Sequence, residues 1–520
     1  MRKFNVTGLC VPNKHYMADV SGKIAQIAAM VEHGDYFTIN RGRQYGKTTT
    51  LWLLERHLSE KYPIISVSFE GVDDRVFETP ENFCQGFLYI CSKYLREKDL
   101  PDSETWVNSS VTTFDLLDAF LNKICMDKKI VLMIDEVDKT SNNFVFLKFL
   151  GMLRDKYLKR NRDLGATFQS VILAGVYNIK NLKLKMIQAG THQLEDGEKR
   201  ANSPWNIAAD FEVDMSLSAP EIATMLSEYE KDHQTGMDIE AISKEIRACT
   251  SGYPYLVSRL CQKIDEKLGK DWTVKGVKNA AKAIIFEKNL LFDDIIKNME
   301  SNEELFNLLY DIIISGRRFL YNHFNPAMRL GVMFGILSES NGALVIHNAI
   351  FETFICEYLI SLKDTARRGR DLGIGVVEGS KFNMELCIRK FAQHYYEIYH
   401  KKDRDFLERE CRLLFLTFLR PLINGAGFYH LESETRNGER TDVIVDYNSE
   451  QFIIELKLWY GDVSHAKALE QIAGYLDSKN KDTGYLLTFD FRKTENAVKP
   501  NFEWVESRGK KILDAMVGAF

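Results

Sequence analysis

The sequence lacks the features of a secreted or membrane-embedded protein. Its nine cysteines are scattered and include no CxxC pair, which argues against a disulfide framework and against a zinc ribbon. No stretch approaches the roughly 18 uninterrupted apolar residues of a membrane span, and MRKFNVTGLCVPNK at the start has no apolar run of signal-peptide length. We therefore expect a cytoplasmic protein with reduced thiols and no membrane partner.

Internal repeats, low-complexity tracts and a proline-rich linker are also absent, since the ten prolines do not cluster. The formal net charge of -5 gives no general attraction to nucleic acid, so such binding would need a local patch. The 520 residues, 45% of them hydrophobic, are enough for about three or four domains. Domain boundaries must therefore come from changes of pattern along the chain.

Residues 35–215 alternate short β-branched runs with longer helical patterns. The expected strands are DYFTIN, PIISVSFEG, IVLMIDEVD, SVILAGV and DFEVDMSL, and helices are expected from Lys47, twice within 80–127, and near 143–159. Strands separated by helices predict right-handed crossovers and a mostly parallel sheet covered on both faces. The predicted fold class of this part is α/β.

The segment INRGRQYGKTTTLW, residues 39–52, approximates a phosphate-binding loop between the first strand and the first helix. Gly46 lets the backbone approach a phosphate, Lys47 can reach the β and γ phosphates, and the Thr48 hydroxyl can bind Mg²⁺. The motif requires glycine at position 41, where this chain has arginine, so a basic strand-to-helix turn is the alternative. The residues expected around ATP are Gly42, Arg43, Gln44, Tyr45, Gly46, Lys47, Thr48 and Thr49.

A second motif, KKIVLMIDEVDK at 128–139, favours the nucleotide site. Its apolar strand ends at Asp135 and Glu136, at the carboxyl edge of the sheet where ligands bind in such folds. Asp135 would hold Mg²⁺ and Glu136 would polarise the attacking water, although a solvated acidic turn would look similar by itself. Asn178 is either a γ-phosphate sensor or a turn residue. Contacts of Arg41 and Arg43 with phosphate, a neighbouring subunit or solvent are left open.

With these motifs the chain resembles the AAA-like P-loop ATPases of bacteria that carry a helical lid, a winged helix and a PD-(D/E)XK nuclease-like tail. Members of that family often have an arginine-rich sequence before GK[ST]. The resemblance implies an ATPase domain at 1–215, a lid at 216–290, a winged helix at 291–365 and an α/β nuclease-like domain at 366–520.

The middle of the chain fits this division. Gly252 and Pro254 in SGYPYLVSRLC resemble the glycine-x-proline element of nucleotide-sensing lids, with a plain corner between helices as the alternative. Residues 303–362 read helix, helix, hairpin and helix, with Asn341-Gly342 as the turn. This winged-helix order lacks a dense Lys/Arg recognition helix, which favours a relay role over DNA binding.

The tail contains a hairpin in which Asp442 opens one strand and Glu455-Leu456-Lys457 lies in its partner. A period of two puts Glu455 and Lys457 on one face. The D…ExK spacing is similar to that of PD-(D/E)XK nucleases. Asp442 and Glu455 could bind Mg²⁺ or Mn²⁺, and Lys457 could activate water for phosphodiester hydrolysis. A salt-bridged sheet surface is the alternative.

Neighbouring segments offer further groups for this site. Glu410, or Glu408, on the preceding helix is a candidate metal ligand, and Gln471 and Tyr475 on ALEQIAGYLD resemble the helix that completes the site in that superfamily. Thr441 replaces the proline of the motif's name. The tail is not conspicuously basic, so metal ions would have to offset much of the phosphate repulsion.

The sequence therefore predicts an ATPase run by Lys47, Thr48, Asp135 and Glu136 that controls a metal-dependent nuclease built on Asp442, Glu455, Lys457 and Gln471. DNA, foreign or mobile by analogy, is the expected substrate, and RNA is not excluded. The first alternative is a nucleotide-controlled switch whose tail binds nucleic acid or protein without cutting. The second is a plain ATPase with a structural tail. Homo-oligomer formation is left open.

Overall fold

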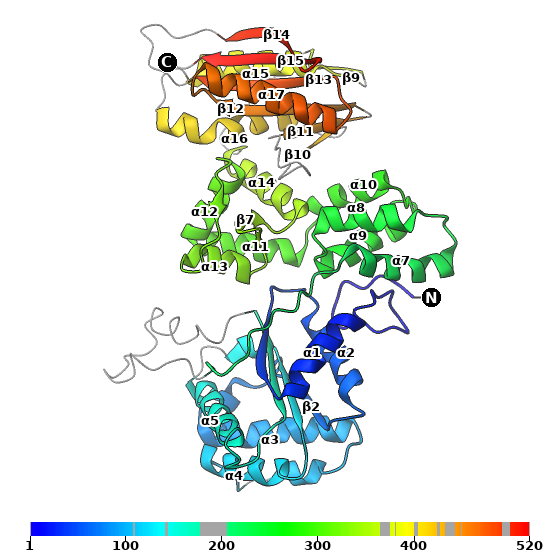
Figure 1. Cartoon of the computed structure of the whole chain (residues 1–520), viewed down its shortest axis with the longest axis vertical. Helices are drawn as coiled ribbons and strands as arrows, with labels where there is room; N and C mark the ends of the chain where they lie inside the picture. The colour runs from blue at the N-terminus through cyan, green and yellow to red at the C-terminus, as the bar shows by residue number, and fades with distance from the viewer. Residues whose placement is uncertain are drawn as a thin grey trace. The chain divides into compact units, whose positions relative to one another are not determined.

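The computed structural model of the chain describes residues 2–107, 110–140, 144–176, 205–364, 375–379, 381–399, 404–423, 427–431, 443–448, 450–490 and 500–518 (Figure 1). The chain forms two compact units, Met1–Ala280 with Met333–Gly335, and Ala281–Val332 with Ile336–Phe520. In the described ranges, no helix has the length and apolar character needed to cross a membrane.

The first unit is built around a four-stranded parallel sheet of order β1-β4-β3-β2. Its elements are α1 (Ser21–His33), β1 (Tyr36–Asn40), α2 (Lys47–Leu58), β2 (Ile64–Ser68), η1 (Asp74–Phe77), α3 (Pro80–Glu97), η2 (Ser103–Trp106), α4 (Phe114–Cys125), β3 (Val131–Asp135), η3 (Val137–Thr140), α5 (Phe144–Arg160) and β4 (Ser170–Gly175). At the carboxyl ends Asn40 pairs with Gly175 and Ser68 with Asp135. The predicted α/β class with a parallel sheet is confirmed.

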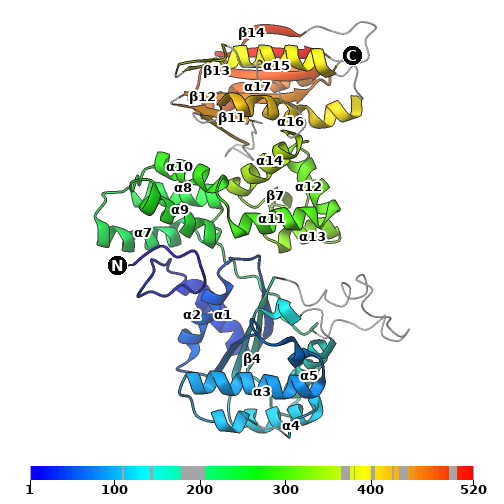
Figure 2. The same cartoon turned by 180° about the vertical axis from the view of Figure 1, so that it is seen from behind.

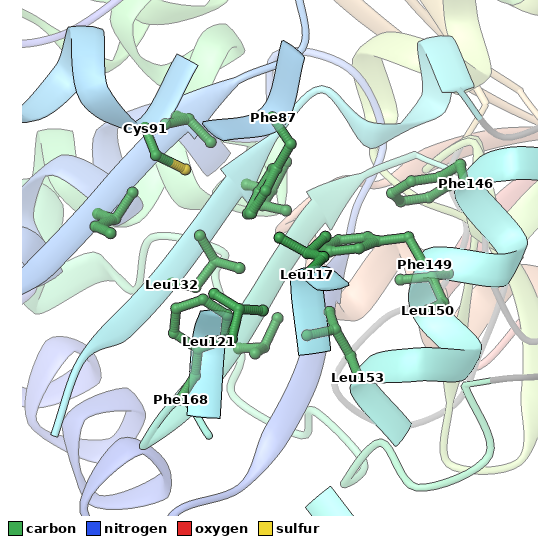
Figure 3. Packing of buried hydrophobic residues seen from close by; sticks show 14 of the residues in the cluster. Phe87, Cys91, Leu117, Leu121, Leu132, Phe146, Phe149, Leu150, Leu153 and Phe168 are labelled. Carbon is green, nitrogen blue, oxygen red and sulfur yellow. The ribbon is translucent and has the colours of Figure 1, made fainter. Parts of the chain in front are cut away.

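Both faces of this sheet are covered. Leu132 and Leu173 belong to a large apolar cluster with residues of α3, α4 and α5, and Figure 3 shows Leu132 close to Phe87, Leu121 and their neighbours. Alternate residues such as Met133 point the other way, where α2 contacts β2, β3 and β4. Burial on both sides explains why these strands read as continuous apolar runs rather than alternating ones.

The prediction of a strand at DFEVDMSL is wrong. The structure has only an isolated bridge between Phe37 and Ala209, in which the Ala209 N–H donates to the Tyr36 carbonyl at 2.8 Å. Beyond it, the Asp214 carboxylate accepts from the N–H and the hydroxyl of Ser216, both at 2.8 Å. Such a local side-chain turn competes with a β ladder and ends the pairing.

The segment predicted as a helical lid contains α7 (Ala219–His233), α8 (Ile239–Thr250), α9 (Pro254–Lys267) and α10 (Val274–Ile285). A capping box between Ser218 and Glu221 begins α7. The N-terminal segment is attached to α7, because Phe4 stacks on Tyr229 with ring centroids 5.2 Å apart and Arg2 forms ion pairs with α7 carboxylates. This attachment places Arg2 and Phe4 beside α7.

The next segment contains α11 (Leu290–Glu300), α12 (Glu303–Ile313), β5 (Phe319–Leu320), α13 (Pro326–Met333), β6 (Leu337–Ser340), β7 (Ala343–Ile346) and α14 (Ala349–Asp364). The strands form an antiparallel sheet of order β5-β7-β6. Asn341 and Gly342 have φ values of 50° and 80°, the left-handed conformations that a tight hairpin requires. The hairpin predicted at this pair is therefore present.

The tail contains a six-stranded mixed sheet of order β10-β11-β12-β13-β15-β14 (Figure 2). Its elements are β8 (Val377–Glu378) and β9 (Lys381–Phe382), which pair separately, α15 (Met384–Tyr399), α16 (Arg404–Ile423), β10 (Gly427–His430), β11 (Val443–Tyr447), β12 (Glu450–Leu458), α17 (Asp462–Ser478), β13 (Thr483–Asp490), β14 (Asn501–Ser507) and β15 (Lys510–Gly518). Ile472 of α17 packs with Ile453 and Leu486 on one face. Phe391 of α15 contacts Phe489, which has the opposite parity on β13, so the helices cover both faces.

Candidate nucleotide-binding site

The loop between β1 and α2 has the shape of a phosphate cradle. Gln44 and Gly46 adopt left-handed φ values of 57° and 79°, and the glycine immediately precedes the first helical residue, Lys47. The buried Lys47 ammonium donates to the carbonyls of Arg41 and Gly42, both at 3.0 Å. Burial lowers the pKa of Lys47. The α2 N-terminus and this ammonium both favour an anion at the loop.

The two motifs predicted from the sequence meet at a direct hydrogen bond. The Thr48 hydroxyl donates to Asp135 Oδ2 at 2.6 Å, and Asp135 Oδ1 accepts from the Glu136 N–H at 2.9 Å. Hydroxyl and carboxylate oxygens are the hard ligands that Mg²⁺ prefers, so this pair is suited to the ion. Strand order does not make β1 and β3 neighbours, since β4 lies between them.

Glu136 occupies a strained position next to this pair. Its φ of 54° is left-handed and unusual for a residue with a side chain. Burial, and then the charge of Asp135, raise the pKa of Glu136. A half-buried carboxyl group of raised pKa in a cleft suits a group that accepts a proton.

The edge of β4 is only partly described. The Asp138 carboxylate accepts from the Val176 N–H at 2.5 Å and fixes the chain as it leaves the strand. Asn178, the predicted phosphate sensor, lies outside the described residues.

A cavity of about 420 Å³ opens beside the loop, which is within the usual volume of small-molecule sites. Its walls include Gln44 to Thr50 and Glu136, all close to the predicted motifs. Pro254 of the glycine-x-proline element lines it as well. Residues missed by sequence reasoning also line it: Asn5, Val6, Gly8, Cys10, Tyr16, Met17, Ala18, Val20, Lys23, Ile24, Ile27, Leu53, Glu70, Met215, Leu217, Met225, Tyr255 and Ser258. The N-terminal residues carry no motif that would have identified them. Glu70 lies within the second predicted strand, PIISVSFEG, where nothing in the local pattern marked it as a site residue.

The glycine-x-proline element of the lid contacts the loop. The Tyr253 hydroxyl donates to the Arg43 carbonyl, and the Tyr253 and Tyr45 rings meet edge to face at 4.7 Å. Gly252 has φ of 71°, and a Cβ there would lie 2.0 Å from the Leu217 carbonyl oxygen, so only glycine fits. The turn at Gly252 therefore fixes Tyr253 and Pro254 beside the loop between β1 and α2.

The two arginines of the loop differ in their surroundings. Arg41 is half-buried, donates to the Val213 carbonyl at 3.1 Å and lies over the Phe211 ring. Burial lowers the pKa of Arg41. Arg43 is exposed. Of the three options left open for Arg41, a purely solvated side chain is wrong.

In the tail, Glu455 and Lys457 lie close together as their spacing predicts. The Glu455 side chain is 1% exposed, and its Oε1 is 2.5 Å from Lys457 Nζ. Gln471 is half-buried and Tyr475 buried on α17, which contacts β12. Asp442 and the side chains of Glu408 and Glu410 lie outside the described residues. Within the described ranges, no group of three or more His, Cys, Asp or Glu side chains could hold a metal ion.

Comparison with known proteins identifies the front of the chain. A family model for the AAA-like domain matches residues 10–357. Similar solved structures include a Walker-type ATPase of Pyrococcus abyssi, with 11% identity, 68% of this chain and 99% of that chain covered, and a TM-score of 0.45. ORC2 of Aeropyrum pernix, in complexes with ADPNP and ADP, has 11% identity, coverage of 70% and 98%, and a TM-score of 0.37. Cdc6p of Pyrobaculum aerophilum has 13% identity, coverage of 68% and 98%, and a TM-score of 0.32. Among curated proteins no match was found.

Proposed function

This chain belongs to the AAA-like domain family, and we propose that it binds ATP with Mg²⁺ in the cavity beside Lys47 and hydrolyses it there. The observation that carries the proposal is the hydrogen bond between Thr48 and Asp135. It joins the two motifs that phosphoryl-transfer sites of this type need, one for the phosphates and one for the metal.

Each residue has a distinct task in this proposal. Lys47 and the loop N–H groups bind the β and γ phosphates, and Thr48 and Asp135 hold Mg²⁺, which neutralises phosphate charge. Glu136 lines the cavity beside Lys47 and orients a water molecule for in-line attack, accepting its proton as the new bond to phosphorus forms. Tyr253 connects the state of the loop to the lid.

Binding and hydrolysis can be tested separately. We expect Lys47→Ala to lose ATP affinity, because the buried ammonium has no substitute. Glu136→Gln should keep that affinity but lower kcat by about 10² to 10⁴-fold, as loss of a general base does. Lys61→Ala is a matched control, since Lys61 is exposed and its ion pair is with the exposed Glu32. ATP hydrolysis by Glu136→Gln at the wild-type rate would contradict the proposed mechanism.

For the tail we propose a metal-dependent nuclease whose activity depends on the nucleotide state of the ATPase domain. Support comes from the Glu455–Lys457 pair on the face of β12 that α17 covers. In addition, β11 begins at Val443, which pairs with Ile454 next to Glu455. Asp442 precedes Val443 in the sequence. Asp442, Glu455 and Glu410 would hold Mg²⁺ or Mn²⁺, and Lys457 and Gln471 would act on the water.

The alternative, a switch that binds nucleic acid or protein without cutting, is favoured by one observation. Glu455 is already ion-paired with Lys457, as in a structural salt bridge. Purified wild type and Asp442→Ala should be incubated with plasmid, single-stranded DNA and RNA, with Mg²⁺ or Mn²⁺, and with or without ATP. Cutting by wild type alone supports the nuclease, whereas binding without cutting under every condition supports the switch.

We also propose a cytoplasmic location, action on foreign or mobile DNA, and domain boundaries near residues 215, 290 and 365. The sequence patterns described above are their support. Limited proteolysis with mass-spectrometric mapping of the cut sites tests the boundaries, because linkers between folded domains are cleaved first.

A further inference from the structure

Glu70 is held beside the strand that ends in Asp135. It follows β2 by two residues, and the last residue of β2, Ser68, pairs with Asp135. The Phe69 N–H donates to the Asp135 carbonyl at 3.1 Å, and the Glu70 N–H donates to the Ser68 hydroxyl at 3.1 Å. The backbone that leads into Glu70 is therefore fixed at the sheet edge where the two motifs meet.

Two acidic residues line the cavity, and Glu70 is one of them. The other is Glu136. Asp135 does not line it, because its two carboxylate oxygens are turned toward the Thr48 hydroxyl and the Glu136 N–H. Water in the cavity would thus meet two carboxylates, one that follows β2 and one that follows β3, and these two strands are neighbours in the sheet.

No structural interaction in the described part of the chain explains a glutamate at position 70. In the described part of the chain its carboxylate forms no hydrogen bond or ion pair, and the side chain is exposed. Lys23, a second cation on the cavity wall, is already bound by Glu221 at 2.8 Å and by the Ser216 carbonyl.

We propose that Glu70 is a second catalytic carboxylate, which holds the attacking water together with Glu136. This inference rests on the proposed ATP hydrolysis. The water has two hydrogens: Glu136 takes one as a proton while Glu70 accepts a hydrogen bond from the other. A lone pair on the water oxygen then points at the γ phosphorus. The bond from that oxygen to phosphorus forms, the bond from phosphorus to the β–γ bridging oxygen breaks, and ADP and phosphate leave.

The experiment compares ATP hydrolysis by wild type, Glu70→Gln, Glu136→Gln and the double variant, with Glu60→Gln as the matched control. Glu60 is an exposed glutamate of the same unit that does not line the cavity. Affinity for a non-hydrolysable ATP analogue and the Mg²⁺ concentration for half-maximal rate are measured for each. Glu70→Asp keeps the charge on a shorter side chain and should recover part of the rate.

Glu70→Gln should lower kcat about 10 to 100-fold, less than the loss of a general base, because Glu70 orients the water without taking its proton, while analogue affinity changes less than about twofold. Because both carboxylates act on one water, the double variant should fall little below Glu136→Gln. A kcat within about twofold of wild type overturns the inference, as does a loss that added Mg²⁺ restores, which would place Glu70 in the metal shell. Wild type without turnover overturns the proposed function as well, whereas a hydrolysing wild type and an equally active Glu70→Gln overturn only the role of Glu70.

Discussion

The two lysines of the candidate sites are held in different ways. Lys47, on the ATPase side, donates to two backbone carbonyls and forms no ion pair with any described residue. Lys457, in the tail, is 2.5 Å from the carboxylate of Glu455. Neutral carbonyls position an ammonium without cancelling its charge, whereas a carboxylate cancels it. Lys47 can therefore attract a phosphate directly. Lys457 can do so only when another cation, such as a metal ion bound to Glu455, takes its place beside that carboxylate.

The largest expected effect is on ATP hydrolysis, which should depend on Lys47 and not on Lys457. Lys47→Ala should reduce ATP hydrolysis at least about 100-fold, because phosphate binding and charge stabilisation are lost together. Lys457→Ala should leave basal hydrolysis within about twofold. Phosphate release under saturating Mg²⁺ measures both. Equal losses in the two variants would mean that the difference in lysine environment has no functional consequence.

A second effect concerns the stability of the tail, which Lys457→Met should lower more than Glu455→Gln. Lys457→Met removes the ammonium that balances a nearly fully buried carboxylate, so we expect a loss of about 2 to 4 kcal/mol in the free energy of unfolding. Glu455→Gln should cost less, because the half-exposed Lys457 ammonium can turn to water. Chemical denaturation monitored by fluorescence gives both values. A larger loss of stability in Glu455→Gln than in Lys457→Met would show that the buried Glu455 carboxylate does not need the Lys457 ammonium to balance its charge.

A third effect tests the fixed turn that brings the lid to the loop. Gly252→Ala places a methyl group against the Leu217 carbonyl in a left-handed backbone conformation. We expect a loss of about 1 to 3 kcal/mol in stability together with weaker nucleotide binding. Gly236→Ala is the matched control, since Gly236 also has positive φ, 74°, but nothing lies within 4 Å of its Cβ position. Similar nucleotide affinities in the two variants would show that the turn at Gly252 does not affect nucleotide binding.

The smallest effect is expected at the hydroxyl that joins lid and loop. Tyr253→Phe removes one hydrogen bond to the Arg43 carbonyl and keeps the ring contact with Tyr45. We expect a change of about 0.5 to 1.5 kcal/mol, seen as an ADP release rate a few-fold faster. Stopped-flow release of a fluorescent ADP analogue is the measurement. An unchanged rate of ADP release would show that the Tyr253 hydroxyl does not influence nucleotide release and that Tyr253 acts through packing alone.

The comparison also shows what sequence could and could not predict. Asp135 and Glu136 were predictable because they end and follow a buried strand, and Lys47 and Thr48 because they begin the helix after the first strand. Parallel strands bring both places to one edge of the sheet. The place of Glu70 was not, because it depends on β3 lying beside β2, an order that local pattern does not contain. Cavity residues 5–18 were missed because they contribute walls rather than a motif.

Other misses have local causes. The strand expected at DFEVDMSL fails because Asp214 turns the chain through its own side chain. Strand β14 was not predicted, since NFEWVES exposes most of its residues at an edge of the sheet and has little apolar alternation. The site in the tail stays a prediction, because Asp442 and the side chain of Glu410 lie outside the described residues.

The most direct test of the central claim is the steady-state rate of phosphate release from Mg·ATP by wild type and by Glu136→Gln, each shown to bind the nucleotide. The account predicts measurable turnover by wild type, and a fall of at least about 100-fold in the variant with affinity preserved. Turnover that is the same in both proteins, or none in a wild type that binds Mg·ATP, would contradict it.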